Sequence, residues 1–91
     1  MRPVQNKGMP MSTTLKEYIR YEREYNLTIG ERVRVCRSAS ADEGGWNNTW
    51  NSAMDTYVGQ TYTITSVGQD DGSGINLGCF RFPYFILERV R

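Results

Sequence analysis

Apolar and polar residues alternate or cluster in several short stretches of the chain, as is typical of half-buried β-strands. Four stretches show this pattern, at residues 27–37, 61–67, 75–79 and 86–90. In the first, Val33 and Val35 fall on one face with Ile29 at the same parity, and arginines occupy the other face. The second is the clearest, because threonine, isoleucine and tyrosine favour extended backbone. We therefore expect four or five short strands, the fifth if residues 80–82 form a strand of their own.

Residues 12–26 follow a different period, in which apolar side chains recur at spacings of three and four. The stripe consists of Leu15, Tyr18, Ile19, Glu22 and Tyr25. This period predicts a helix, interrupted on its apolar face by the carboxyl group of Glu22. Thr14 and Glu17 have the spacing of a capping box, and Asn26 can end the helix in the left-handed conformation. We expect the helix to pack on the strands as a lid; a partner-binding or dimerisation helix with exposed tyrosines is the alternative.

The stretch at residues 44–59 (GGWNNTWNSAMDTYVG) contains both tryptophans of the protein. Trp46, Trp50, Met54 and Tyr57 follow one another at intervals of four, four and three residues. Such spacing predicts that all four lie on one face of a short helical segment. We expect a long, ordered loop, which we call the tryptophan loop, whose aromatic side chains cover one end of a small β-barrel.

Composition and proline mark the remaining connections. Residues 68–74 (GQDDGSG) predict a hairpin tip, because glycine and aspartate tolerate positive φ. Pro83 cannot donate to a strand ladder, so the FPYF segment predicts one 3₁₀ turn. Residues 1–11 contain two prolines and no period, which predicts a disordered leader. The 91 residues suit a single domain.

Charge and residue chemistry narrow the classes of function. The net charge of +1 gives no overall electrostatic reason to bind nucleic acid. No apolar run has the length of a membrane span, so cytoplasmic residence and no membrane partner are expected. The chain has no histidine, and its carboxylates are not paired on one rigid element, so we expect neither an enzyme nor a catalytic residue.

Cysteine content argues against a metal or a cofactor. Cys36 and Cys79 fall in separate predicted strands, without a third cysteine or a histidine to complete a tetrahedral site. We expect both to be buried thiols that pack as small apolar residues. A disulfide is the alternative, followed by a metal site.

The segments GERVRV, YVGQTYTITSV, DDGSG and FPYFILERV resemble small SH3-like or KOW-like barrels that begin G-x-x-V-x-V. The chain is also similar to short uncharacterised phage and prophage proteins that pair a WxxxW loop with a terminal FPYFxLE. The resemblance covers residues 29–90. It implies a mainly β fold, with an SH3-like barrel of four to five strands at residues 27–91 and the helix of residues 12–26 packed on it.

Departures from these families limit what the resemblance implies for binding. The ALYDY-like segment and the tryptophan pair of peptide-binding SH3 domains are missing, although Pro83 and Tyr84 resemble the proline–tyrosine element that lines their groove. Polyproline binding is therefore not supported. KOW-type barrels contact RNA through basic loops, whereas the loops here are acidic or neutral.

The aromatic residues suggest a non-enzymatic binding module, because large aromatic side chains dominate interface energies. As a phage or mobile-element accessory protein it would contact a host or phage protein in the host cytoplasm. The expected partner-binding residues are Trp46, Trp50, Tyr57, Phe82, Pro83 and Tyr84.

Two alternatives remain open. Arg32, Arg34 and Arg37, beside the tryptophan loop, could bind single-stranded nucleic acid, although such a row is more often a solvated face that protects a sheet edge. The third hypothesis is a pocket between helix and barrel that sequesters a small molecule such as a nucleotide.

Overall fold

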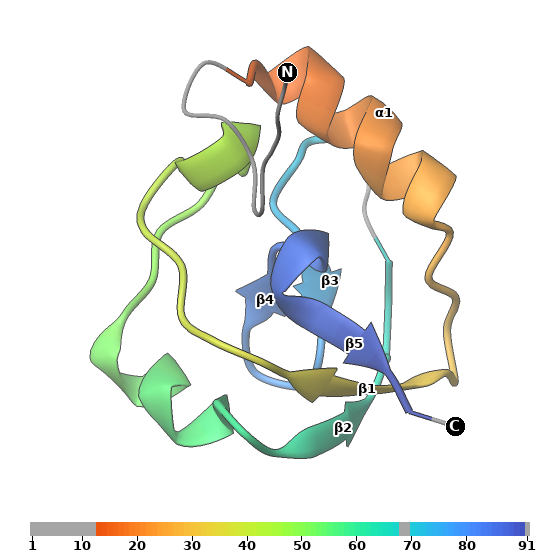
Figure 1. Cartoon of the computed structure of the whole chain (residues 1–91), viewed down its shortest axis with the longest axis vertical. Helices are drawn as coiled ribbons and strands as arrows, with labels where there is room; N and C mark the ends of the chain where they lie inside the picture. The colour runs from red at the N-terminus through yellow and green to blue at the C-terminus, as the bar shows by residue number, and fades with distance from the viewer. Residues whose placement is uncertain (1–12, 68–69, 91) are drawn as a thin grey trace, which may run out of the picture.

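The computed structural model describes residues 13–67 and 70–90, and within them five short strands form two antiparallel sheets (Figure 1). The strands are β1 (Arg32–Val35), β2 (Thr61–Thr63), β3 (Ile75–Asn76), β4 (Arg81–Phe82) and β5 (Leu87–Arg89). One α-helix, α1 (Leu15–Tyr25), precedes them. Three 3₁₀ turns complete the described elements, η1 (Glu43–Gly45), η2 (Ser52–Tyr57) and η3 (Tyr84–Ile86). Figure 1 shows α1 at one end of the molecule and the β1–β2 pair at the other.

The first sheet has the strand order β2-β1-β5, and the second pairs β3 with β4. Val33 lies at the centre of the larger sheet, opposite Tyr62 on one side and Arg89 on the other. Within the described residues, an isolated bridge from Ser66 to Asn76 joins the segment after β2 to strand β3. The predicted strand number and the N-terminal helix are therefore confirmed. The described strands do not close into one barrel, and the fold is a mixed α/β arrangement rather than a mainly β one.

Helix α1 begins and ends where its sequence predicts. The Thr14 hydroxyl accepts a hydrogen bond from the Glu17 backbone N–H at 3.1 Å, and the Glu17 carboxylate accepts one from the Thr14 N–H at 2.9 Å. Asn26 adopts the left-handed conformation with φ of 61°. The helix buries Tyr18 completely, with its ring 5.2 Å from that of Tyr84. Through Tyr18 the helix therefore packs against η3.

The core joins the helix, the loop and both sheets. Its buried apolar residues are Tyr18, Leu27, Val33, Val35, Ala39, Trp46, Met54, Ile64, Ile75, Leu77, Phe82, Tyr84, Ile86 and Leu87. Trp46 is completely buried, and its indole N–H donates to the Ser73 carbonyl at 2.7 Å. Gly74 lies directly against this indole, because a Cβ at that position would meet Trp46 Nε1 and the Phe82 carbonyl. The tryptophan loop is therefore part of the core.

Three local expectations are wrong. Ile29 is 66% exposed rather than buried, because Gly30 has a φ of 91° and the turn from Thr28 to Glu31 breaks the strand parity. The strand expected over residues 61–67 ends at Thr63. The tryptophan loop is not one helical segment, because η1 ends before Trp46.

Both cysteines are exposed and free, so the prediction of buried thiols is wrong. Cys36 directly follows β1, and its neighbour Val35 takes the inward position. Cys79 lies in the tight turn between β3 and β4, where Leu77 donates its N–H to the Phe80 carbonyl. The 3₁₀ turn expected at the FPYF segment is confirmed as η3, with Pro83 at its N-cap.

The predicted leader at residues 1–11, and residues 68–69 of the predicted hairpin tip, lie outside the described part of the chain. Within residues 13–67 and 70–90, α1 is neither long nor apolar enough to cross a bilayer. The same residues contain no cluster of cysteine, aspartate and glutamate that could hold a metal ion.

Candidate functional site

Turn η2 positions the aromatic residues of the loop. The Asn51 side chain caps its start by accepting a hydrogen bond from the Ala53 N–H at 2.9 Å. Met54 is buried in the core and fixes one side of the turn. The indole N–H of Trp50 donates to Asp55 Oδ1 at 2.7 Å. This turn therefore holds Trp50 and Tyr57 in fixed orientations over the strands.

Four half-buried rings, Trp50, Tyr57, Tyr62 and Phe80, form a surface that we call the aromatic face. Tyr57 stacks on Tyr62 with ring centroids 4.4 Å apart and an interplanar angle of 28°. Phe80 meets Tyr57 edge-on at 5.8 Å. Tyr57 lies in η2, Trp50 just before the cap of η2, Tyr62 in β2 and Phe80 in the β3–β4 turn, so the rings come from three separate parts of the sequence.

Phe82 supports the aromatic face from below. Its ring is completely buried, lies 5.0 Å from that of Tyr57 and meets Trp50 edge-on at 5.7 Å. Desolvation raises the pKa of the Tyr57 hydroxyl, and the neighbouring Cys79 thiol adds to the rise. The rings are thus backed by the core, and each leaves part of its surface open to a partner.

The structure divides the expected partner-binding residues into two groups. Trp50 and Tyr57 lie on the aromatic face. Trp46, Phe82 and Pro83 are completely buried and Tyr84 is 7% exposed, so these four are core residues in this conformation. Their suggested role in contacting a partner is not supported by their positions.

Sequence reasoning missed two members of the aromatic face, Tyr62 and Phe80. The alternation of residues 61–67 places Tyr62 on the same face as Ile64, whose exposure is 1%. This pattern alone therefore predicts that Tyr62 points inward. Strand β2 ends at Thr63, and Tyr62 stays half-buried while Ile64 enters the core. Phe80 carried no such signal, because the turn of residues 77–80 sets its direction.

Helix α1 covers Pro83 and Tyr84, the pair considered above for polyproline binding. Tyr84 packs against Tyr18 at 5.2 Å and Tyr25 at 5.5 Å, and its backbone N–H donates to the Tyr18 hydroxyl at 3.3 Å. Pro83 is buried beside it. A polyproline ligand therefore has no access to this pair while α1 is docked.

The predicted arginine strip is largely engaged by carboxylates. Arg37 pairs with Glu43 at 3.0 Å, and Arg34 lies 3.7 Å from Glu88. Arg32 is exposed, and no ion pair to it is seen among the described residues. The expected neighbour Trp46 is buried, so the arginines and an exposed tryptophan do not form one stacking surface there.

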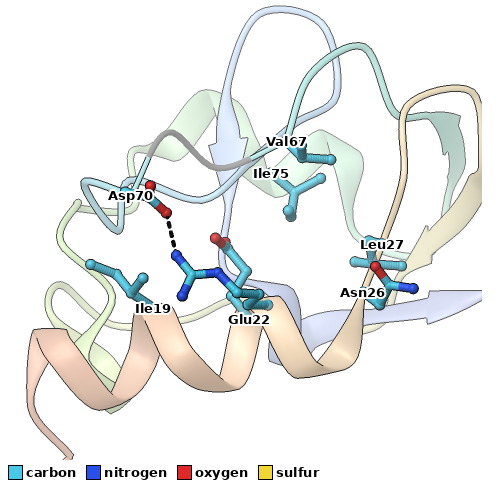
Figure 2. A pocket seen from close by; sticks show the side chains of 8 residues that line it. Ile19, Glu22, Asn26, Leu27, Val67, Asp70 and Ile75 are labelled. Carbon is cyan, nitrogen blue, oxygen red and sulfur yellow. Dashed lines mark hydrogen bonds and ion pairs between the residues drawn. The ribbon is translucent and has the colours of Figure 1, made fainter.

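A cleft of about 200 Å³ separates α1 from the segment that leads into β3 (Figure 2). Its lining consists of Ile19, Glu22, Arg23, Asn26, Leu27, Val67, Asp70 and Ile75. The cleft matches the predicted position of a small-molecule pocket between the helix and the strands. Its chemistry differs from that of a nucleotide site, because Arg23, the cation in the lining, already pairs with Asp70 at 2.7 Å.

Glu22 is one of three ionisable residues that line this cleft, together with Arg23 and Asp70. Figure 2 shows its side chain rising from α1 into the space between Asp70 and Ile75. The Tyr18 hydroxyl donates to Glu22 Oε2 at 2.9 Å. Burial raises the pKa of the Glu22 carboxyl, the Tyr18 hydrogen bond lowers it, and the charges of Asp71 and Asp70 raise it further. The cleft therefore combines apolar side chains with the carboxyl groups of Glu22 and Asp70 and the guanidinium of Arg23.

Comparisons with models of protein families, with curated proteins and with solved structures gave no match for this chain. The aromatic face and the cleft are therefore interpreted from their own geometry.

Proposed function

We propose that the protein is a non-enzymatic binding module that contacts another protein through the aromatic face. The supporting observation is the stack of Tyr57 on Tyr62, with Phe80 edge-on and Phe82 behind it. Rigid, half-exposed aromatic rings lose little conformational entropy on binding and are enriched among residues that dominate interface energies. The face lies on elements that converge from three parts of the chain.

The proposed SH3-like origin of the module rests on the resemblance of its sequence segments. The loop between β1 and β2 contributes Trp50 and Tyr57 to the aromatic face. The proposed phage or mobile-element origin rests on the resemblance of the WxxxW and FPYFxLE segments alone.

The charge around the aromatic face favours a protein over single-stranded nucleic acid. Single-strand binding combines stacking rings with nearby cations. Here Asp55 lies beside Trp50, and the arginine–ring contacts in the described residues involve Tyr21, Tyr25 and Phe85 instead. No described cation is therefore stacked on the rings of the face.

Affinity capture from a lysate of the encoding organism's host, read by mass spectrometry, tests this proposal. The double variant Trp50→Ala/Tyr62→Ser removes two half-buried rings of the aromatic face, and Tyr21→Ala, a half-buried tyrosine on α1, is the matched control. We expect a reproducible set of proteins with wild type and control that is lost with the double variant. Each purified candidate is then tested directly for binding.

Tyr62 on β2 is the register partner of Val33 on β1, so its replacement could disturb the sheet. Circular dichroism must therefore show that the double variant is folded. Capture of the same purified partner by the double variant would refute the role of the aromatic face. Filter binding of single-stranded DNA and RNA at low and high salt tests the nucleic-acid alternative. Salt-sensitive binding that is lost with Arg32→Gln would support the nucleic-acid alternative in its place.

A further inference from the structure

We propose that the cleft between α1 and the segment of residues 70–75 binds a small alkylammonium group, with the ammonium on Glu22 and the alkyl chain on the apolar wall. This site lies apart from the aromatic face, which is built by η2, β2 and the β3–β4 turn. The proposal is therefore independent of the proposed protein-binding function.

The shape and wall of the cleft fit a short aliphatic chain. The apolar residues of the lining are Ile19 on the helix, Leu27 after its cap, Val67 and Ile75 on β3, and of these Leu27 and Ile75 are 6% and 1% exposed. A volume of about 200 Å³ is room for roughly seven waters at about 30 Å³ each, or a chain of similar size. This is below the usual range of nucleotide and drug-sized sites, so only a small ligand or one long side chain fits.

The charge of the cleft selects a cation. Glu22 faces Asp70 and Asp71 on the opposite segment, and all three are carboxylates. Arg23 is held by Asp70 at 2.7 Å, and Arg81, whose charge also acts on Glu22, donates to the Gly74 carbonyl. A phosphate or carboxylate ligand would be repelled, whereas an ammonium would compensate the partly buried charge.

One oxygen of Glu22 is available for such a ligand. The Tyr18 hydroxyl occupies Oε2 at 2.9 Å, and in the described part of the chain no donor reaches Oε1. The Tyr18 hydroxyl also accepts from the Tyr84 N–H at 3.3 Å, which fixes its hydrogen toward Glu22. An alkylammonium therefore finds a carboxylate oriented by the core, and it can donate a charge-assisted hydrogen bond.

Titration of the full chain with n-butylammonium chloride, followed by methyl NMR, tests the proposal. We expect saturable shifts of the Ile19 and Ile75 methyl signals with a Kd in about the millimolar range, as suits so small a ligand. Ile29, which is 66% exposed and outside the cleft, is the internal control. Butanol and butyrate, which have the same chain without the positive charge, should shift these signals much less.

Two matched variants test whether the negative charge of Glu22 binds the ammonium group. Glu22→Gln keeps the shape and the acceptor for Tyr18 but removes the charge, and it should weaken butylammonium binding by about tenfold or more. Glu24→Gln makes the same change on an exposed position of the same helix and should leave binding unaltered. Equal affinity of wild type and Glu22→Gln, or equal binding of butanol and butylammonium, would overturn the proposal.

The amine could be a free small molecule or the side chain of a lysine. Titration with Nα-acetyl-lysine methylamide distinguishes these sources, because its backbone groups add bulk at the end of the chain. Binding tighter than that of butylammonium assigns the cleft to a lysine side chain, and weaker binding assigns it to a free amine. Absence of saturable shifts with both probes would refute the site.

Discussion

Glu22 stands where the helical period of α1 expects an apolar side chain. Its neighbours on the stripe, Tyr18 and Tyr25, pack on Tyr84, whereas Glu22 directs a carboxyl group into the cleft. Burial raises its pKa above the ordinary value of 4.5. A residue that resists ionisation in the fold costs stability at neutral pH, which is common where a side chain serves binding.

Replacing Glu22 with glutamine should therefore stabilise the protein at pH 7. A group with a raised pKa in the folded state contributes stability only while it is protonated, so this contribution is lost as the pH rises through the folded pKa. The glutamine side chain would keep the hydrogen bond from Tyr18 without a charge to bury. We expect the melting temperature of Glu22→Gln to exceed that of wild type at pH 7, and the difference to shrink at pH 4. A lower melting temperature at pH 7 would contradict this account.

Gly74 is required by packing, whereas Gly59 is required only by its backbone. Both have positive φ, at 114° and 87°. A Cβ at Gly74 would meet the Phe82 carbonyl and Trp46 Nε1, and a Cβ at Gly59 would meet nothing within 4 Å. Gly74→Ala should therefore destabilise the protein by about 1–3 kcal/mol more than Gly59→Ala. Urea unfolding of the two variants measures the difference, and equal losses would show that backbone strain alone decides.

At the scale of elements, Arg89 joins the end of α1 to strand β5. Its guanidinium donates from Nη2 to the carbonyls of Tyr25 and Asn26 at 2.7 and 2.8 Å. It also forms an ion pair with Glu31 and lies 4.9 Å from the centroid of the Tyr25 ring. The carbonyls at the end of a helix carry partial negative charge, so a cation there is favourable. The planar fork of arginine serves several acceptors at once.

Arg89→Met should destabilise the protein by about 1.5–3 kcal/mol, because it leaves these acceptors without their charged donor. Arg34→Met is the matched control on strand β1. Arg34 is 49% exposed and lies 3.7 Å from Glu88, so its removal should cost about 0–1 kcal/mol. Equilibrium unfolding in urea compares the two variants. Similar losses would mean that Arg89 acts only as a surface ion pair.

Elements that are set by neighbouring residues could be predicted from the sequence, whereas features that depend on contacts between distant residues could not. The capping box and Asn26 specify α1 within a few residues, and Pro83 specifies η3. The burial of Trp46 could not be inferred in this way, because it depends on the Ser73 carbonyl, 27 positions along the chain. The aromatic face escaped prediction in part for the same reason, since its rings come from three separate elements.

At the scale of the whole molecule, several carboxylates stabilise the fold through backbone hydrogen bonds. Glu17, Glu31 and Asp71 accept from the backbone N–H groups of Thr14, Thr28 and Ser73, and these bonds lower the pKa of each carboxyl group. A group with a lowered pKa in the folded state contributes stability above its unfolded pKa and loses it as the pH falls. The pH dependence of stability that these three groups cause is therefore opposite in sign to that caused by Glu22.

We therefore expect the free energy of unfolding to decrease as the pH falls below about 4.5, through the range in which these three groups become protonated. Urea titrations at pH 7, 4 and 3 measure the trend. Glu31→Gln should flatten it, because one of the three groups no longer titrates. A free energy of unfolding that rises steadily toward pH 3 would show that Glu22 outweighs the other three.

The two tryptophans occupy contrasting surroundings, which equips the protein with its own optical reporters. Trp46 is sealed in the core, whereas Trp50 is half-buried at the rim and bonded to Asp55. Their emission should accordingly separate into a blue component shielded from acrylamide and a red component open to quenching. A Trp46→Phe or Trp50→Phe protein isolates one component, so docking of a partner and loss of the fold can be followed in a single cuvette without any added dye.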